Sequence, residues 1–203
     1  MKRFIIYFSC IMSLILLSGC AMDNAPTKRV EKFLNNYTSN NQSVLEQLKE
    51  MVDSDSLMTE DQKNTYSNIM KKQYKDMTYV IKDEVIDGNN ATVTAEIEVY
   101  DYYKINKETE EYYTKNPNEF KADNGLVGDI VDSAKKAASD VKDAVTETTS
   151  NSKYVEYRLD KLNDAKDRVK YTIDFNLTKV NNKWTLNDID DATRQKIHGL
   201  YEH

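Results

Sequence analysis

The feature that most constrains the fold is the segment Val169–Asp188, which begins with a strict alternation of apolar and polar residues over Val169–Thr178. Its apolar members are Val169, Tyr171, Ile173, Phe175 and Leu177, and polar residues stand between them. Side chains of a β-strand point alternately to opposite faces, so this period predicts a half-buried strand. The sequence Val180-Asn181-Asn182-Lys183 then favours a turn, and Trp184 and Leu186 resume the apolar face. We therefore predict an antiparallel hairpin with one apolar side.

A second hairpin is predicted upstream, at the turn sequence Asp87-Gly88-Asn89-Asn90. This turn separates Thr78–Ile86 from a second alternating stretch, whose apolar members are Ala91, Val93, Ala95, Ile97 and Val99. We expect the second strand to run on into Tyr100-Asp101-Tyr102-Tyr103. The residues Tyr100, Tyr102, Tyr103 and Trp184 are candidate binding residues, because their rings combine apolar area with a polar group. Packing within the sheet is the alternative, since the chain has 14 tyrosines.

Helical periods surround the two hairpins and are expected to cover the sheet. A first helix is predicted from the spacing of Val30, Phe33, Leu34 and Tyr37, and a second from Val44, Leu45, Leu48, Met51 and Val52. Thr59 and Gln62 fit a capping box that begins a third helix. A last short helix is expected from Thr193 to His198, ended by Gly199. Core packing is the expected role of these apolar stripes, with a ligand groove as the alternative.

Residues 104–167 separate the two hairpins and are expected to form a long helical insertion. Spacings of four and three relate Val127, Val131, Ala134, Ala138, Val141 and Val145. This stripe predicts a helix over 127–148 that docks loosely or orders with a partner, because it is rich in alanine and poor in leucine. Tyr154, either Tyr157 or Arg158, Leu162 and Ala165 predict a further helix that leads into the strand at Val169. The predicted fold class is thus α+β, with helices packed on a curved antiparallel sheet of about four strands.

The N-terminus is typical of a secretory signal, because Lys2 and Arg3 precede the apolar run Phe4–Leu17. A transmembrane anchor is the alternative, but the run is shorter than the ~20 apolar residues that span a bilayer. The sequence Leu17-Ser18-Gly19-Cys20 that ends the run resembles the lipobox of bacterial lipoproteins. The resemblance implies that signal peptidase II cuts between Gly19 and Cys20. It also implies that lipidated Cys20, with acyl chains such as palmitate, holds the chain on the cell membrane, facing outside the cytoplasm.

These predictions divide the chain into a signal peptide over 1–19, a lipidated N-terminus and spacer over 20–27, and a single α+β domain over 28–203. The domain resembles the nuclear-transport-factor-like (cystatin-like) fold, as in uncharacterised Gram-positive envelope lipoproteins. The residues that carry this resemblance are Val30–Tyr37, Asp87–Val93 and Lys179–Leu186. The resemblance implies a cone-shaped domain, and it leaves open whether the helical insertion over 104–167 obstructs the mouth of the cone.

Charge and residue content argue against several classes of function. The net charge of −6 disfavours binding to nucleic acid, whose phosphates repel an acidic surface. The two histidines, His198 and His203, lie at the C-terminal end, and both cysteines lie within the first 20 residues. Catalysis by a nucleophile and histidine, a metal site and a cofactor are therefore not expected.

Acidic residues at three places are candidates for cation binding or acid–base catalysis. Asp53 and Asp55 lack the glycine and glutamate of a calcium loop, and Asp188, Asp190 and Asp191 fit helix capping better than cation binding. Glu96 and Glu98 stand on a polar strand face, where carboxylates are usually solvated.

We therefore predict a non-catalytic, membrane-anchored lipoprotein that binds a protein, a peptide or a cell-wall component. The alternative is a small-ligand carrier or an enzyme that uses a pocket inside the cone. A deep pocket that holds a buried Asp or Glu beside Tyr100 or Tyr102 would favour that alternative, and a filled cone would count against it.

Overall fold

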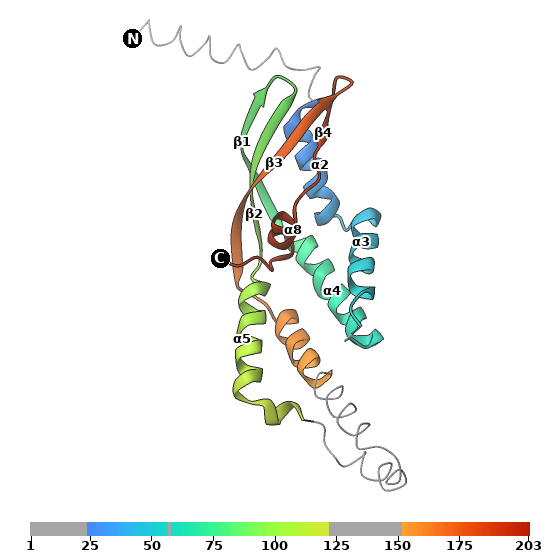
Figure 1. Cartoon of the computed structure of the whole chain (residues 1–203), viewed down its shortest axis with the longest axis vertical. Coiled ribbons are helices and arrows are strands. Elements are labelled where there is room, and N and C mark those ends of the chain that lie inside the picture. The colour runs from blue at the N-terminus through green and yellow to red at the C-terminus, as the bar shows by residue number, and fades with distance from the viewer. Residues whose placement is uncertain (1–23, 57, 122–151) are drawn as a thin grey trace, which may run out of the picture. The chain divides into compact units, whose positions relative to one another are not determined.

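The computed structural model describes residues 24–56, 58–121 and 152–203 (Figure 1). The predicted signal peptide, Cys20 and the helix expected over 127–148 lie outside these residues. The described chain forms two compact units. The first contains the described residues up to Asn35 together with Tyr79–Glu96 and Thr172–Ile189, and the second contains Asn36–Thr78, Ile97–Tyr171 and Asp190–His203 in their described parts. Within the described ranges, no helix is both long enough and apolar enough to cross a membrane.

Four antiparallel strands form an open sheet in the order β1-β2-β3-β4 (Figure 1). Their bounds are Thr78–Asp87 for β1, Asn90–Tyr100 for β2, Arg168–Val180 for β3 and Lys183–Leu186 for β4. The β3–β4 turn places Asn181 and Asn182 at φ angles of 49° and 61°, a left-handed conformation that asparagine tolerates and that suits a type I′ hairpin. Alternate residues of β2 and β3 are buried, as the sequence period predicts. The predicted α+β class and its four-stranded antiparallel sheet are therefore confirmed.

The first unit packs the start of helix α2 (Pro26–Thr38) against the sheet. The ring of Phe33 meets that of Phe175 edge-on at a centroid distance of 5.7 Å. At the beginning of the helix, the backbone N–H of Thr27 donates to the carboxylate of Glu84 at 2.8 Å. That carboxylate satisfies a helix N–H that has no partner within the helix itself.

The second unit is mainly helical. Its elements are α3 (Gln42–Asp53), α4 (Glu60–Asp76), α5 (Tyr102–Lys115), the 3₁₀ turn η3 (Pro117–Phe120), a helical segment over 152–163 and α8 (Asp191–His198). The predicted capping box is confirmed, because Thr59 and Gln62 each bond the backbone of the other. Asp190 caps α8 by accepting from the N–H of Thr193 at 2.8 Å, so capping accounts for this aspartate.

A buried glutamine ties α4, β2 and α8 together within this unit. The Gln73 side chain is fully buried, and its amide N–H groups donate to the carbonyls of Tyr100 at 3.1 Å and His198 at 3.0 Å. Its oxygen accepts from the N–H of Tyr100 at 2.8 Å. Both polar ends of the side chain are thus satisfied, which a fully buried amide requires.

The junction between β2 and α5 differs from the prediction. We expected the strand to continue through Tyr102 and Tyr103, but β2 ends at Tyr100 and both residues lie in the first turn of α5. The reason is Asp101, whose carboxylate accepts from the N–H of Lys104 at 2.9 Å and so caps a helix. The expected helical insertion between the hairpins is confirmed in its described parts by α5, η3 and the segment 152–163.

Candidate functional site

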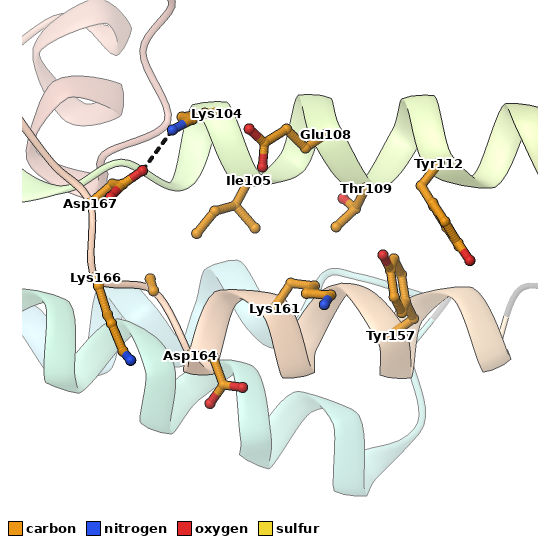
Figure 2. A pocket seen from close by; sticks show the side chains of 11 residues that line it. Lys104, Ile105, Glu108, Thr109, Tyr112, Tyr157, Lys161, Asp164, Lys166 and Asp167 are labelled. Atoms are coloured by element: carbon orange, nitrogen blue, oxygen red, sulfur yellow. Dashed lines mark hydrogen bonds and ion pairs between the residues drawn. The ribbon is translucent and has the colours of Figure 1, made fainter.

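A groove of about 510 Å³ lies between α5 and the helical segment 152–163 (Figure 2). Its lining combines two tyrosines, three lysines, three acidic residues and a few small or apolar side chains. These residues are Lys104, Ile105, Glu108, Thr109, Tyr112, Tyr157, Lys161, Asp164, Ala165, Lys166 and Asp167. A concave surface with several kinds of polar group is the usual setting of a binding site.

Helical spacing explains why these side chains share one groove. Ile105, Thr109 and Tyr112 stand four and three residues apart on α5, so they lie on one face of the helix. Tyr157 and Lys161 are four residues apart on the facing segment (Figure 2). The Thr109 hydroxyl donates to the carbonyl of Asn106 at 2.9 Å, which satisfies this polar group in its buried position.

An ion pair closes one end of the groove. The ammonium of Lys104 lies 2.6 Å from the carboxylate of Asp167 (Figure 2). The hydrogen bond and the charge of Lys104 lower the pKa of Asp167, and the same contact raises the pKa of Lys104. Both groups therefore stay charged at neutral pH, and neither is poised to transfer a proton.

Aromatic rings form the other end of the groove. The rings of Tyr112 and Tyr157 stack at a centroid distance of 5.3 Å, and the ammonium of Lys161 lies 5.3 Å from the centre of the Tyr157 ring. The Tyr112 hydroxyl donates to Glu119 at 2.8 Å, and this hydrogen bond raises its pKa. Tyr112 remains 37% exposed, so part of its ring is available to a ligand.

Three further rings support these two tyrosines. Phe120 is buried, and its ring centroid lies 5.4 Å from that of Tyr157 and 5.9 Å from that of Tyr154. The ring centroids of Tyr113 and Tyr154 lie 4.5 Å apart. We name the five rings of Tyr112, Tyr113, Phe120, Tyr154 and Tyr157 the aromatic cluster. Such mutual contacts restrict ring motion, and a rigid aromatic surface loses little entropy on binding.

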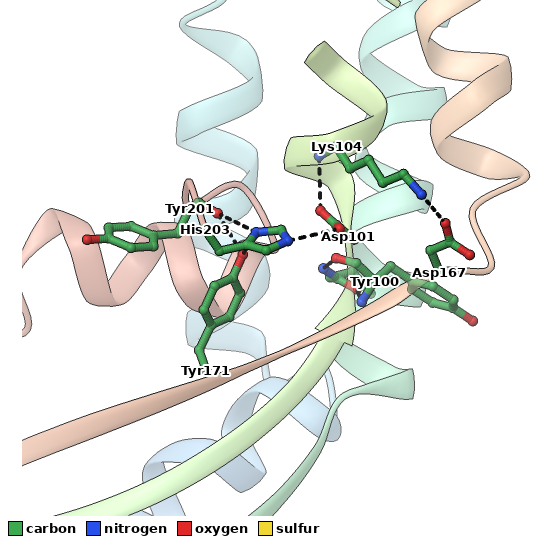
Figure 3. Close-up of polar contacts among 8 residues, drawn as sticks. Tyr100, Asp101, Lys104, Asp167, Tyr171, Tyr201 and His203 are labelled. Carbon is green, nitrogen blue, oxygen red and sulfur yellow. Dashed lines mark hydrogen bonds and ion pairs between the residues drawn. The ribbon is translucent and has the colours of Figure 1, made fainter. Parts of the chain in front are cut away.

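A second polar network lies at the beginning of α5 (Figure 3). Asp101 is buried, and besides capping α5 it lies 3.3 Å from Nε2 of His203. The Tyr171 hydroxyl donates to the carbonyl of Tyr201 at 2.7 Å, and burial raises its pKa to about 12. The Tyr171 phenol therefore keeps its proton at neutral pH, and its hydrogen bond fastens the C-terminal residues.

The structure places the tyrosines predicted to bind a ligand outside the groove. Tyr100 and Tyr102 stack on each other at 6.1 Å, and the ring of Tyr103 lies 6.1 Å from that of His203. Tyr102 is buried, and its hydroxyl donates to the carbonyl of Ile69 at 3.3 Å. The Tyr100 hydroxyl donates to the carboxylate of Asp76 at 2.9 Å.

The remaining candidates lie elsewhere. Trp184 belongs to the first unit, where it is buried on β4. The lipidation and cleavage residues Cys20 and Gly19 are outside the described ranges. In the part of the chain that the structure describes, no group of three or more His, Cys, Asp or Glu residues could hold a metal ion.

The groove residues of α5 were missed at the sequence level, although a signal for them exists. Asp101 is a good N-cap, and Lys104, Glu108 and Tyr112 follow at intervals of four. Those intervals predict a helix with one shared face. Because we expected β2 to continue past Asp101, we did not predict a helix from these intervals.

Comparisons with known proteins give one likeness. No protein-family model matches this chain, and no curated protein matches it. Among solved structures, the chain is similar to a Bacillus subtilis subsp. subtilis str. 168 protein described as a "putative lipoprotein (ycdA)", with 13% sequence identity and a TM-score of 0.43. The likeness covers 80% of this chain and 47% of that chain, so this chain spans about half the length of that protein.

Proposed function

We propose that this protein is a membrane-anchored envelope lipoprotein whose folded part binds a segment of another protein, without catalysing a reaction. The anchor is Cys20, and the support for it is the sequence Leu17-Ser18-Gly19-Cys20 after a short apolar run. Two or more acyl chains anchor stably, at ~0.8 kcal/mol per buried methylene. Because the acyl chains hold the protein at the membrane, its acidic chain needs no basic patch for attachment.

The groove between α5 and the segment 152–163 is the observation that supports a protein partner. Its tyrosines offer ring surface, and its lysines and carboxylates offer charges of both signs along one path. Tyrosine is enriched in protein interfaces, where its ring provides area and its hydroxyl a hydrogen bond. Paired charges fix the register of a bound segment more than they add affinity.

A binding role also agrees with the protonation states of the groove. Lys104 and Asp167 stabilise each other as charged groups, and the pKa of Tyr112 is raised. General acid–base catalysis works best with a group whose pKa lies near the working pH. We therefore assign the groove to recognition.

The fold class that we propose is the nuclear-transport-factor-like cone. Its support is the packing of Phe33 in α2 on Phe175 of the antiparallel sheet, and the two hairpins that form that sheet. Proteins that share such a fold differ widely in function, so the function is argued from the groove alone.

Replacing Cys20 with alanine tests the anchor. We expect the Cys20→Ala chain to accumulate as an uncleaved or mislocalised precursor, because the thiol is the group that takes the lipid. The measurements are metabolic labelling with a fatty acid and the mass of the N-terminal fragment. Cys10→Ala is the matched control and should be labelled and cleaved normally. Normal labelling of Cys20→Ala would exclude lipidation at this residue.

Reversing one charge in the groove tests the binding surface. Lys161 is exposed, lines the groove and lies over the ring of Tyr157. We expect Lys161→Glu to reduce capture of the partner from a membrane fraction roughly tenfold or more, because a reversed charge opposes the complementary group. The measurement is the amount of captured protein, with the full chain immobilised at equal density.

The control for this test is Lys107→Glu. Lys107 is an exposed lysine of α5 that does not line the groove, so it undergoes the same charge change outside the proposed surface. This variant should capture as much partner as the unaltered chain. Equal capture by Lys161→Glu and the unaltered chain would contradict binding in the groove.

A further inference from the structure

A second hollow, of about 390 Å³, lies in the helical unit and is separate from the groove. Residues of α3, α4 and α8 line it, together with Tyr37 near the end of α2. Its volume falls in the lower part of the ~300–1,000 Å³ range of small-molecule sites. It is therefore large enough for a small organic molecule, and we name it the α3–α8 pocket.

One wall of the α3–α8 pocket is apolar. Val44, Leu48 and Met51 line it at intervals of four and three residues, so they share one face of α3, to which Gln47 adds an amide. The rings of Tyr37 and Tyr74 add aromatic surface and meet edge-on at 5.2 Å. An apolar chain or ring placed on this wall would leave water, at a gain of about 25 cal/mol per Å² of buried area.

His198 and Tyr74 add an uncharged polar pair to the lining of the pocket. Nε2 of His198 lies 3.1 Å from the hydroxyl of Tyr74. Burial lowers the pKa of His198 to about 4 and raises the pKa of Tyr74, so both groups are uncharged at neutral pH. In the tautomer that carries its proton on Nδ1, the imidazole accepts from the Tyr74 hydroxyl through Nε2 and keeps the Nδ1–H group as a donor. Within the described ranges, Nδ1 has no hydrogen-bond acceptor.

A cation stands one helical turn away. Arg194 precedes His198 by four residues on α8 and lines the same pocket. Its side chain is 50% exposed, and its ion pair with Asp191 at 2.6 Å engages Nη1. After burial, the positive charge of Arg194 is the second cause that lowers the pKa of His198.

We propose that the α3–α8 pocket binds a small carboxylate that carries an apolar chain or ring. The carboxylate accepts from the Arg194 guanidinium and from Nδ1 of His198, and the apolar part lies on Val44, Leu48 and Met51. A neutral ligand would gain nothing from the positive charge of Arg194, which its ion pair with Asp191 engages only through Nη1. A purely polar anion would make no use of the apolar side chains of α3.

Octanoate is the probe for this site, with octanol and butanoate as comparisons. The experiment follows amide and imidazole resonances by NMR while each probe is added to the full chain in lipid nanodiscs. We expect octanoate to shift the resonances of α3 and the His198 ring. Butanoate has four fewer methylenes and should bind roughly 200-fold more weakly, at ~0.8 kcal/mol per methylene. Octanol should bind at least roughly tenfold more weakly, because it lacks the charge-assisted hydrogen bonds.

Two variants of α8 assign the carboxylate contact. Arg194→Gln should weaken octanoate binding roughly tenfold or more, since it removes a charged hydrogen-bond partner. Lys196→Gln is the matched control, because it removes the same charge from the same helix and Lys196 does not line the pocket. Lys196→Gln should leave the affinity unchanged. Because octanoate enters the nanodisc lipid equally in both samples, comparing the two variants removes the effect of that partition. Equal binding of octanol and octanoate, equal weakening by both variants, or no shifts on α3 would overturn the proposal.

Discussion

Replacing Gly199 with alanine should lower the free energy of unfolding by about 3–5 kcal/mol, more than most single substitutions do. Gly199 ends α8 with a φ angle of 71°, in the left-handed region that costs an alanine ~1–2 kcal/mol. The N–H of Gly199 donates to the carbonyl of Lys196, and the N–H of Leu200 donates to the carbonyl of Gln195. These two bonds form a Schellman motif, which needs this conformation at its glycine.

Close packing around Gly199 adds the larger part of the expected effect. A Cβ atom there would overlap the carbonyl oxygen of Tyr100 and the side-chain nitrogen of Gln73. Gln73 cannot move without breaking its bonds to Tyr100 and His198, and an unsatisfied buried amide costs about 1–3 kcal/mol. Strain and clash therefore act together at this position.

Gly88→Ala is the matched control for Gly199→Ala. Gly88 also has a positive φ angle, of 59°, but an added Cβ would meet no described atom within 4 Å. This substitution should cost only the conformational strain, ~1–2 kcal/mol. Thermal and urea unfolding followed by circular dichroism measure both effects. Equal losses for the two alanine variants would show that contact with Tyr100 and Gln73 contributes nothing.

The sheet could be predicted because its signal is local and of period two. Every second residue of β3 from Tyr171 to Leu177 is buried, in agreement with the sequence alternation. The two asparagines of the β3–β4 turn are among the few residue types that accept positive φ angles. The helix starts at Thr59 and Asp190 could be predicted as well, because a capping side chain bonds the backbone only a few residues away.

The groove could not be predicted as a groove, because its two sides are distant in sequence. Lys104 and Asp167 are separated by 63 residues and form an ion pair in the structure. Pairings over such a separation depend on tertiary packing, which no local period encodes. The tyrosines were also ambiguous, because a tyrosine side chain suits both a core and a binding surface. Tyr102 is buried, whereas Tyr112 is partly exposed in the groove.

The α3–α8 pocket shows the same division between local and tertiary information. Val44, Leu48 and Met51 were predicted as the apolar face of a helix. His198 was noted for its position near the C-terminal end, and its contact with Tyr74 spans 124 residues. The burial that keeps its imidazole neutral arises only when α4 and α8 pack together. A histidine count therefore could not reveal this donor.

Trp184→Ala should lower the free energy of unfolding by roughly 3–5 kcal/mol, the usual cost of truncating a buried tryptophan. Trp184 is only 6% exposed, and the strand register places Trp184 of β4 opposite Lys179 and Leu186 opposite Leu177. The Trp184 side chain therefore lies on the apolar face of the sheet, where its removal would leave a cavity. The ammonium of Lys179 lies 5.5 Å from the indole and would lose a cation–π contact as well.

The size of this effect separates a core tryptophan from a ligand-binding one. A tryptophan kept for binding would lie exposed and tolerate alanine with a change near ~0.5 kcal/mol, as surface positions do. Val180→Ala is the control, because Val180 belongs to the same hairpin and is 53% exposed. Trp184 is the single tryptophan of the chain, so circular dichroism must replace fluorescence for both variants. An unchanged melting temperature for Trp184→Ala would contradict burial of the indole and return Trp184 to the candidate binding residues.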